Sequence, residues 1–254
     1  MKALAYANLI IISLILIGQS FAKVDPSTCI GMWLFDEGTG KVAKDSSGNG
    51  NDGTLMNDPK WVDGKFGKAL EFDGNDDAVE IPDSESLNDV DDLTISAWVF
   101  LNRAVTSGTW NSLVGKKPYT SGYLMWIEVP QEPCGLVYVG GRFDNRAGTQ
   151  IDLKSWYHLV FTRVHDGGMK FFINGKLVKE ASSSSGIIST LAAPISIGGQ
   201  SPQVLDGIID DVAIFNVALT EDSISSIMKN GLKFIFAVSS KGKLAGVWGD
   251  IKAQ

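Results

Sequence analysis

The residues of this chain that are best suited to chemistry are oxygen donors near both ends. Asp36 follows a short apolar segment, and a loop rich in Asp, Asn and Gly occupies residues 45–53. Asp210 lies near the other end, inside an alternating apolar segment. Ca²⁺ binds six to eight oxygens and accepts carboxylates together with amide and backbone carbonyls. We therefore expect Asp36, Asn51 and Asp210 to hold a structural Ca²⁺ that ties the first strand to the last.

Turn chemistry is the alternative explanation for these residues. Asp, Ser and Asn are common in tight turns because their side chains bind nearby backbone amides. Residues 45–53 therefore fit an ordinary loop as well as a metal site, and Asp36 could instead pair with an arginine or with backbone amides. A second acidic segment, residues 73–77, is more typical of a hairpin turn. The sequence leaves both interpretations of the oxygen donors open.

Patterns typical of a catalytic site are absent from the sequence. Retaining glycosidases need two close carboxylates. Glu128 and Glu132 have no carboxylate between them, and Pro130 interrupts the strand in which they would lie. The two histidines, His158 and His165, fall in a strand pattern and in a turn pattern. The chain has neither a Gly-x-Ser-x-Gly elbow nor a His-Glu-x-x-His motif. We expect no catalytic residues and no enzyme activity.

Aromatic and polar side chains are the candidates for ligand binding. Flat aromatic rings can pack against the C–H faces of sugars, and Trp110 and Tyr119 lie in a segment that also contains lysines. Arg142 and Asn145 belong to a polar loop that could bind hydroxyl groups or an acidic sugar. Large aromatic residues more often pack in a core. We expect core packing for Trp33, Trp98, Trp126 and Trp156.

The segments that would position these residues follow a β pattern almost throughout. Short runs alternate in polarity, and 28 glycines separate them. Closely spaced strands with turn signals are typical of an antiparallel two-sheet sandwich. The candidate strands are residues 30–35, 69–72, 78–81, 93–101, 111–115, 123–129, 135–139, 156–163, 169–173, 176–180, 195–197 and 207–215.

Two local signals define a hairpin and a helix. Asn174-Gly175 suits a type I′ turn because both residues tolerate positive φ. One short helix is expected near the C-terminus, with Thr220 as its N-cap and Gly231 as its stop. Its apolar residues recur at the helical spacing of positions 224, 227 and 228.

The first 22 residues have the pattern of a signal peptide. A charged start precedes an apolar run, and the small residues Ser20 and Ala22 occupy positions −3 and −1 of a cleavage site after Ala22. The run is short for a membrane span, so we expect cleavage, secretion and no span in the mature chain. Secretion would also permit a disulfide between Cys29 and Cys134. Two buried thiols are the equal alternative, because the sequence does not say how far apart they lie.

Composition excludes several classes of partner. The formal net charge is −7, and no block of Lys and Arg offsets it. Such an acidic surface repels nucleic acid and anionic lipid, so we expect neither as a partner. The 44% hydrophobic content supports a sizeable core.

A series of motifs resembles a known family. The motifs are WLFDEG at 33–38, DSSGNGN at 45–51, ALEFDG at 69–74, LTISAW at 93–98, WYH at 156–158, FING at 172–175 and IDDVAIFNVAL at 209–219. In this order they resemble the laminin G-like jelly-roll domains of secreted bacterial proteins, within the concanavalin A-like lectin/glucanase superfamily. The resemblance implies a jelly-roll domain over residues 23–231. Residues 232–254 would then be a tail, which we expect to add an edge strand.

The resemblance also sets the functional expectation. Ligands of this fold typically meet the concave sheet or the rim loops, and its glucanases usually have a metal-binding Asp near the position of Asp210. We expect a secreted, non-catalytic module that binds glycans and contains a structural calcium. A protein-adhesion or cell-surface structural module is the alternative, and a glycoside hydrolase or polysaccharide lyase ranks third.

Overall fold

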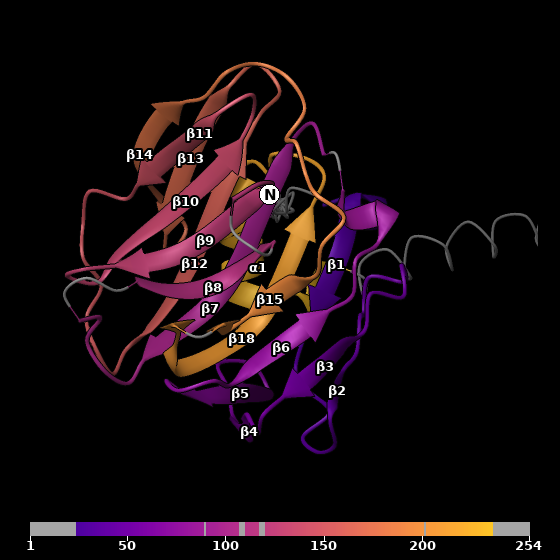
Figure 1. Ribbon diagram of the computed structural model, residues 1–254, viewed down its shortest axis with the longest axis vertical. Helices are drawn as coiled ribbons and strands as arrows, with labels where there is room; N and C mark the ends of the chain where they lie inside the picture. The colour runs from indigo at the N-terminus through magenta and orange to yellow at the C-terminus, as the bar shows by residue number, and fades with distance from the viewer. Residues whose placement is uncertain (1–23, 89, 107–109, 117–119, 201, 236–254) are drawn as a thin grey trace, which may run out of the picture.

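The computed structural model describes residues 24–235 except 89, 107–109, 117–119 and 201. These residues form two eight-stranded sheets that stack as two layers (Figure 1). All strand pairs within the two sheets are antiparallel, and one short helix follows the last strand, which confirms the predicted jelly-roll sandwich. Two 3₁₀ turns, η1 (Pro26–Thr28) and η2 (Glu85–Leu87), and a hairpin of β16 (Gly199–Gln200) and β17 (Gln203–Val204) complete the elements.

The first sheet contains the first and the last strand of the described chain. Its order is β14-β13-β12-β7-β18-β5-β4, and β1 also pairs with β18. The bounds are β14 (Lys176–Ser182), β13 (Gly168–Ile173), β12 (Trp156–Arg163), β7 (Leu93–Leu101), β18 (Asp206–Phe215), β5 (Lys68–Asp73), β4 (Lys60–Asp63) and β1 (Cys29–Trp33).

The last strand changes its partner halfway along its length. Residues 206–209 of β18 pair with β5, whereas residues 212–215 pair with β1. Asp210 and Asp211 lie between these two halves, where the register with β7 shifts and Asp211 has a φ of 46°. They form a β-bulge at the point where the neighbouring strand changes.

The second sheet is the other layer of the sandwich. Its order is β11-β10-β9-β8-β15-β6-β3-β2. The bounds are β11 (Arg142–Arg146), β10 (Glu132–Tyr138), β9 (Tyr123–Glu128), β8 (Trp110–Lys116), β15 (Ile195–Ile197), β6 (Ala78–Ile81), β3 (Gly53–Met56) and β2 (Val42–Ala43).

The main core fills the space between the two sheets. Alternate residues of β7, Ile95, Ala97 and Val99, face this core and are fully buried. The residues between them face outward but are buried as well, because the first sheet is covered on its outer side. There, helix α1 (Glu221–Asn230) packs Ile224 against Val160 of β12.

The helix and the hairpin follow the predicted signals. The Thr220 hydroxyl oxygen accepts a hydrogen bond from Ser223 N at 3.3 Å, and Gly231 ends the helix with a φ of 74°. Asn174 and Gly175 both have positive φ, 49° and 73°, as a type I′ turn requires. Both predictions are confirmed.

Trp33, Trp98 and Trp126 are buried as predicted, but only Trp33 lies between the two sheets, and Trp156 is only half-buried. Trp33 is fully buried and belongs to the main core. Trp98 and Trp156 face the outer side of the first sheet, and Trp126 faces the outer side of the second sheet. The strand period of two places them opposite the core-facing residues, and other side chains cover them there.

The start of the tail and the cysteines are also described. Residues 233–235 are helical, and Leu232 and Ile235 belong to the same apolar cluster as Met32. The rest of the tail lies outside the described residues, so the edge strand stays a prediction. Cys29 and Cys134 are both buried free thiols. They belong to separate apolar clusters on different sheets, so no disulfide joins them.

Some segments lie outside the described residues. The predicted signal peptide, residues 1–22, and the rest of the tail are among them. Within the part of the chain that the structure describes, no helix is long and apolar enough to cross a membrane.

Candidate functional site

Side chains on the outer side of the second sheet form a continuous polar and aromatic surface across β8–β11. We call this surface the aromatic face. Its position follows from the strand period of two: the alternate residues of these strands, such as Tyr123 and Val137, point into the main core. The aromatic face consists of Trp110, Trp126, Glu128, Tyr138, Arg142, Asp144 and Arg146.

Two tryptophans and an arginine form the centre of this face. The rings of Trp110 and Trp126 meet edge-on, with centroids 6.4 Å apart and an interplanar angle of 71°. The guanidinium carbon of Arg142 lies 5.8 Å from the centroid of the Trp126 ring. Trp126 is buried beneath these neighbours, whereas Trp110 is half-buried and presents part of its ring to solvent. A cation over an aromatic ring holds both side chains in place.

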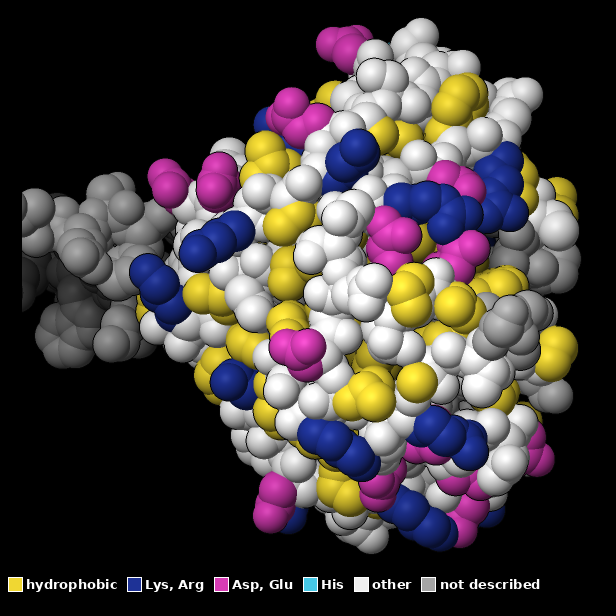
Figure 2. All heavy atoms as spheres, turned by 90° about the vertical axis from the view of Figure 1, so that its left-hand side faces the viewer, with side chains coloured by type: hydrophobic (Ala, Val, Ile, Leu, Met, Phe, Trp, Pro, Cys, Tyr) yellow, Lys and Arg dark blue, Asp and Glu magenta, His cyan; other side chains and the backbone are white. Residues whose placement is uncertain are grey.

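Two ion pairs flank the aromatic rings. Arg142 binds Asp144 through both its Nε and its Nη2, at 2.7 and 3.1 Å. Arg146 on the same strand pairs with Glu128 of β9. Figure 2 looks onto the side of the molecule where β10, β11, β13 and β14 lie, and it shows acidic and basic side chains interleaved in a compact group. The aromatic face therefore offers hydrogen-bond donors and acceptors together, and each of its two arginines has an acidic partner.

The aromatic face is long as well as amphipathic. Trp110 pairs with Glu128 at one end of β9, and Tyr138 N binds Gly122 O just beyond the other end. The six residues of β9 span about 20 Å, at about 3.3 Å per residue. This length exceeds that of a single sugar ring, so the face suits an extended ligand.

The predicted ligand-binding residues separate into two groups. Trp110 and Arg142 both lie on the aromatic face, and Tyr119 lies outside the described residues. Asn145 is a correction: it is 1% exposed and pairs with Gly135, whose Cα faces Phe161 in the core. The predicted polar loop around it is strand β11, and alternation along a strand turns Asn145 inward.

Two aromatic members of the face are not among the predicted ligand-binding residues. The sequence favours core packing for Trp126, and no motif singles out Tyr138. Both occupy the same period-two positions as Leu124 and Leu136, which form the apolar base of the face. The alternation was visible in the sequence. Which of the two alternating sets faces the core was not, because both sets are apolar.

The predicted cation residues Asp36 and Asp210 lie at two sides of one turn. Phe66 N donates to Asp210 Oδ2 at 2.8 Å, and Lys68 N donates to Asp36 Oδ1 at 3.0 Å. The other oxygen of Asp210 accepts from Asp211 N at 2.7 Å, and the other oxygen of Asp36 pairs with Lys233 Nζ at 2.5 Å. We call this set of contacts the clasp. It joins the first and last strands to the turn between β4 and β5.

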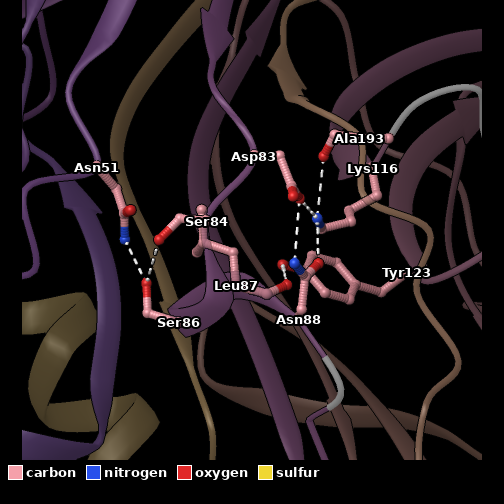
Figure 3. Close-up of polar contacts among 9 residues, drawn as sticks. All are labelled: Asn51, Asp83, Ser84, Ser86, Leu87, Asn88, Lys116, Tyr123 and Ala193. Carbon is pink, nitrogen blue, oxygen red and sulfur yellow. Dashed lines mark hydrogen bonds and ion pairs between the residues drawn. The ribbon is translucent and has the colours of Figure 1, made fainter.

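The third predicted ligand, Asn51, belongs to a different set of contacts. Its side-chain amide donates to Ile30 O at 2.8 Å. It also donates to the Ser86 hydroxyl at 2.9 Å, as Figure 3 shows. Its backbone carbonyl accepts from Trp33 Nε1 at 2.9 Å. With donors already bound to the oxygens of Asp36 and Asp210, the three residues as placed do not fit one shared Ca²⁺ site. Calcium binding by this chain stays a prediction.

Burial raises the pKa values of the two carboxylates in the bulge, Asp210 and Asp211. Desolvation raises the pKa of Asp210 to about 7, although the Phe66 amide works in the opposite direction. Desolvation also raises the pKa of Asp211 to about 6, while its Oδ2 accepts from Leu232 N at 2.9 Å. The two adjacent acids are therefore partly protonated near neutral pH.

A buried lysine fixes the end of β8 next to residues 117–119. The side chain of Lys116 is fully buried, and its Nζ binds Asp83 Oδ1 at 2.8 Å and Ala193 O at 2.9 Å (Figure 3). It also contacts Asn88 Oδ1. Nearby, the hydroxyl of the buried Tyr123 donates to Leu87 O at 3.1 Å (Figure 3). These contacts tie the segment around η2 to the sheet that contains the aromatic face.

The acidic segment at residues 73–77 forms the predicted turn between β5 and β6. Among the described residues, Asp73, Asp76 and Asp77 are the only group of three or more His, Cys, Asp or Glu side chains whose ligand atoms lie within 4.8 Å of one another. Asp77 accepts hydrogen bonds from Asp58 N and Asp73 N, and Asp73 accepts one from Asn75 N. These contacts are those of a tight loop.

The carboxylates and histidines considered for catalysis have structural partners. Glu128 pairs with Arg146, and Glu132 Oε1 accepts from Gly148 N at 2.7 Å. His158 is buried, and desolvation lowers its pKa to about 3, so the ring is neutral. His165 Nδ1 lies 3.2 Å from Asp91 Oδ1 in an exposed turn.

Comparison with protein families gives one match. The model described as the concanavalin A-like lectin/glucanases superfamily matches residues 73–225, which is more than half of the chain. No curated protein matches the sequence.

Several solved structures resemble this chain at low sequence identity. Domain 4 of AbnA, an extracellular arabinanase from Geobacillus stearothermophilus solved in complex with arabinotriose, is 21% identical with a TM-score of 0.65, over 79% of this chain and 98% of that chain. The binding domain of Paraclostridial Mosquitocidal Protein 1 is 19% identical with a TM-score of 0.67, over 80% and 52%. The binding domain of botulinum neurotoxin DC, in complex with rat synaptotagmin II, is 16% identical with a TM-score of 0.64, over 80% and 52%. The chain thus spans about half of the toxin binding domains, and these likenesses show the shared fold.

Proposed function

Because the chain belongs to the concanavalin A-like lectin/glucanase superfamily, we propose that it is a non-catalytic module that binds neutral glycans through its aromatic face. The observation that carries this proposal is the combination of partly exposed aromatic rings with charge-balanced ion pairs on one sheet face. Apolar ring faces suit the C–H faces of sugars, and paired donors and acceptors suit hydroxyl groups.

The balance of charge on the face favours neutral rather than acidic sugars. Arg142 and Arg146 each have an acidic partner, so neither offers an uncompensated positive charge to a ligand. Their remaining N–H groups and the carboxylate oxygens are suited to vicinal hydroxyls, which donate and accept at once. The length of the face would accommodate several sugar units.

The named neighbours support a binding role. One is a domain solved with arabinotriose, and another is the binding domain of Paraclostridial Mosquitocidal Protein 1. A third is from botulinum neurotoxin type C, whose cell entry is described as dependent upon interaction with two ganglioside molecules. We further propose that the protein acts outside the cell, on the support of the signal-peptide pattern in residues 1–22.

A glycan array with the purified full chain tests the proposal. Binding to neutral oligosaccharides is expected, and Trp110→Ala or Arg142→Ala should weaken it by about tenfold or more, the equivalent of about 1.4 kcal/mol. Lys170→Ala is the matched control, since Lys170 is an exposed residue on the other sheet. Circular dichroism would confirm that each variant is folded.

The same experiment separates the alternatives. Absence of binding to every glycan would contradict the proposal and favour protein adhesion, for which the neurotoxin domain in complex with synaptotagmin is the relevant neighbour. Glycan binding that survives Trp110→Ala unchanged would place the site elsewhere on the molecule. Release of shortened oligosaccharides during incubation would show that the module is an enzyme.

A further inference from the structure

A second pocket, distinct from the aromatic face, opens on the outer side of the first sheet. Its volume is about 420 Å³, within the range of small-ligand sites. The turn between β4 and β5 contributes Lys65 and Phe66, the sheet contributes Trp98 and Trp156, and α1 contributes Lys229. Since the two sheets stack through the main core, this pocket and the aromatic face lie on opposite sides of the sandwich.

Aromatic rings form the walls of the pocket. Trp156 is half-buried and packs on Phe100, with ring centroids 5.6 Å apart. Trp98 is buried and meets Phe66 edge-on at 6.0 Å. These contacts fix the rings, while half-buried Trp156 retains apolar surface toward the pocket. A flat apolar wall of this kind suits the C–H face of a sugar ring.

The polar groups around the pocket are nearly all hydrogen-bond donors. Lys65 Nζ lies 4.7 Å from the centroid of the Trp98 ring, and Lys229 is exposed at the end of α1. Within the described part of the chain, neither lysine forms an ion pair with an acidic side chain. The Asn174 side-chain oxygen already accepts from His158 N at 2.9 Å, which leaves the NH₂ group of Asn174 as a donor.

A buried indole N–H adds to the excess of donors. Trp98 is 5% exposed, and its Nε1 has no hydrogen-bond partner among the described residues. A buried donor without an acceptor is destabilising, so Trp98 leaves one unsatisfied donor in the wall of this pocket.

Asp210, the acid across the sheet from Trp98, forms no ion pair with either lysine. Asp210 pairs with Trp98 across β18 and β7, but its two oxygens accept from the Phe66 and Asp211 amides. Gly64 covers the Asp210 carboxylate: a Cβ added to this glycine would lie 2.5 Å from Oδ2. The acceptors of Asp210 are therefore used within the clasp, and the pocket keeps two positive charges with no acidic lining residue.

We propose that this pocket binds an acidic sugar, with the carboxylate between Lys65 and Lys229 and the sugar ring against Trp156. This pocket shares no residue with the aromatic face and lies on the opposite side of the sandwich, so the two sites are independent. A charge-assisted hydrogen bond is shorter and stronger than a neutral one, so the carboxylate would provide most of the selectivity.

Calorimetric titration with tri-galacturonate as the probe, and with the neutral galactotriose as its match, tests this proposal. The full chain should bind the acidic trisaccharide at least about tenfold more tightly than the neutral one. The double variant Lys65→Met/Lys229→Met should lose about tenfold or more, and both residues are exposed, so the fold should persist. Trp156→Ala should also weaken binding, and added NaCl should weaken it in the wild type.

Two controls separate this site from the aromatic face and from charge in general. Lys170→Met/Lys179→Met removes two exposed lysines from β13 and β14 and should leave the affinity for tri-galacturonate unchanged. Trp110→Ala should also leave it unchanged, even if that variant has lost neutral-glycan binding. Equal affinity for the acidic and neutral trisaccharides, no binding of tri-galacturonate, or full binding by Lys65→Met/Lys229→Met would overturn the proposal.

Discussion

The carboxylate of Asp210 accepts a hydrogen bond from the backbone N–H of Phe66 at 2.8 Å, although the two residues are 144 positions apart. This contact joins the bulge in the last strand to the turn between β4 and β5. Asp36, beyond the end of the first strand, accepts from Lys68 N in the same turn. The sequence predicted that donors near the two ends of the chain would be tied together, and the structure ties Asp36 and Asp210 through backbone amides of one turn.

Asp210→Ala should lower the free energy of unfolding by about 1–3 kcal/mol, because it leaves two buried amides without their acceptor. Urea denaturation measures this change. Asp166→Ala, in an exposed hairpin turn, is the control and should change stability by less than about 0.5 kcal/mol. Equal stability of the Asp210→Ala variant and the wild type would show that the clasp contributes nothing.

Stability should depend on pH through the bulge. Burial raises the pKa of Asp210 to about 7 and that of Asp211 to about 6, whereas an unfolded Asp titrates near 4. Between these values the folded state binds more protons than the unfolded state, so the stability from these groups is present below about pH 4 and is lost as the pH rises to 7.

Denaturation series from pH 4 to 8 on the wild type and on Asp210→Asn test this dependence. The stability of the wild type relative to the variant should fall as the pH rises, because the variant cannot titrate at this position. A difference that is constant with pH, or that grows with pH, would contradict the raised pKa of Asp210.

Removal of calcium tests the remaining prediction about the oxygen donors. Because backbone amides and Lys233 already bind the oxygens of Asp36 and Asp210, we expect most of the stability of the clasp to persist in EDTA. Thermal unfolding with EDTA and with added Ca²⁺ measures this. A Tm that falls with EDTA in the wild type but not in Asp210→Ala would instead place a bound Ca²⁺ at the clasp.

Lys116→Met should destabilise the protein by about 2–3 kcal/mol, somewhat less than is usual for a fully buried pair. The side chain of Lys116 is fully buried, but that of its partner Asp83 is 33% exposed and can be hydrated again. The hydrogen bond from Lys116 also lowers the pKa of Asp83 in the folded state. The pair therefore stabilises the fold at a pH above the pKa of Asp83 in the unfolded chain, and this stabilisation is lost as the pH falls through the folded-state pKa.

Urea denaturation of Lys116→Met, with Lys170→Met as the exposed control, measures the contribution of the pair. The exposed pair of Lys170 with Glu180 should contribute less than about 0.5 kcal/mol. Similar effects of the two substitutions would mean that burial gives Lys116 no special role.

The sequence alone determined several local elements of this protein. Alternation over residues 93–101 identified β7, the Asn174-Gly175 pair identified a type I′ turn, and Thr220 and Gly231 identified the ends of the helix. The strand depends on the period of its side chains, the turn on the φ angles that its residues allow, and the helix ends on capping. All three are properties of residues that are adjacent in the sequence, so they can be predicted from the sequence. Short or polar strands such as β2 and β11 were missed, because their residues carry little apolar alternation.

Only the tertiary structure decided which face of each strand became a surface. Trp126 lies in a strand whose two alternating sets are both largely apolar, so periodicity could not tell core from outer face. Trp98 shares its set with the polar residues Thr94 and Ser96, but only the tertiary structure showed that this set is covered on the outer side of the sheet. Asn145 and Arg142 lie on one strand, yet one points into the core and the other covers Trp126. The partners of Asp210 and Lys116 come from distant segments, and no local pattern specifies them. Those long-range contacts formed the clasp and the two candidate binding surfaces, because stacking of the sheets brings together side chains that are far apart in the chain.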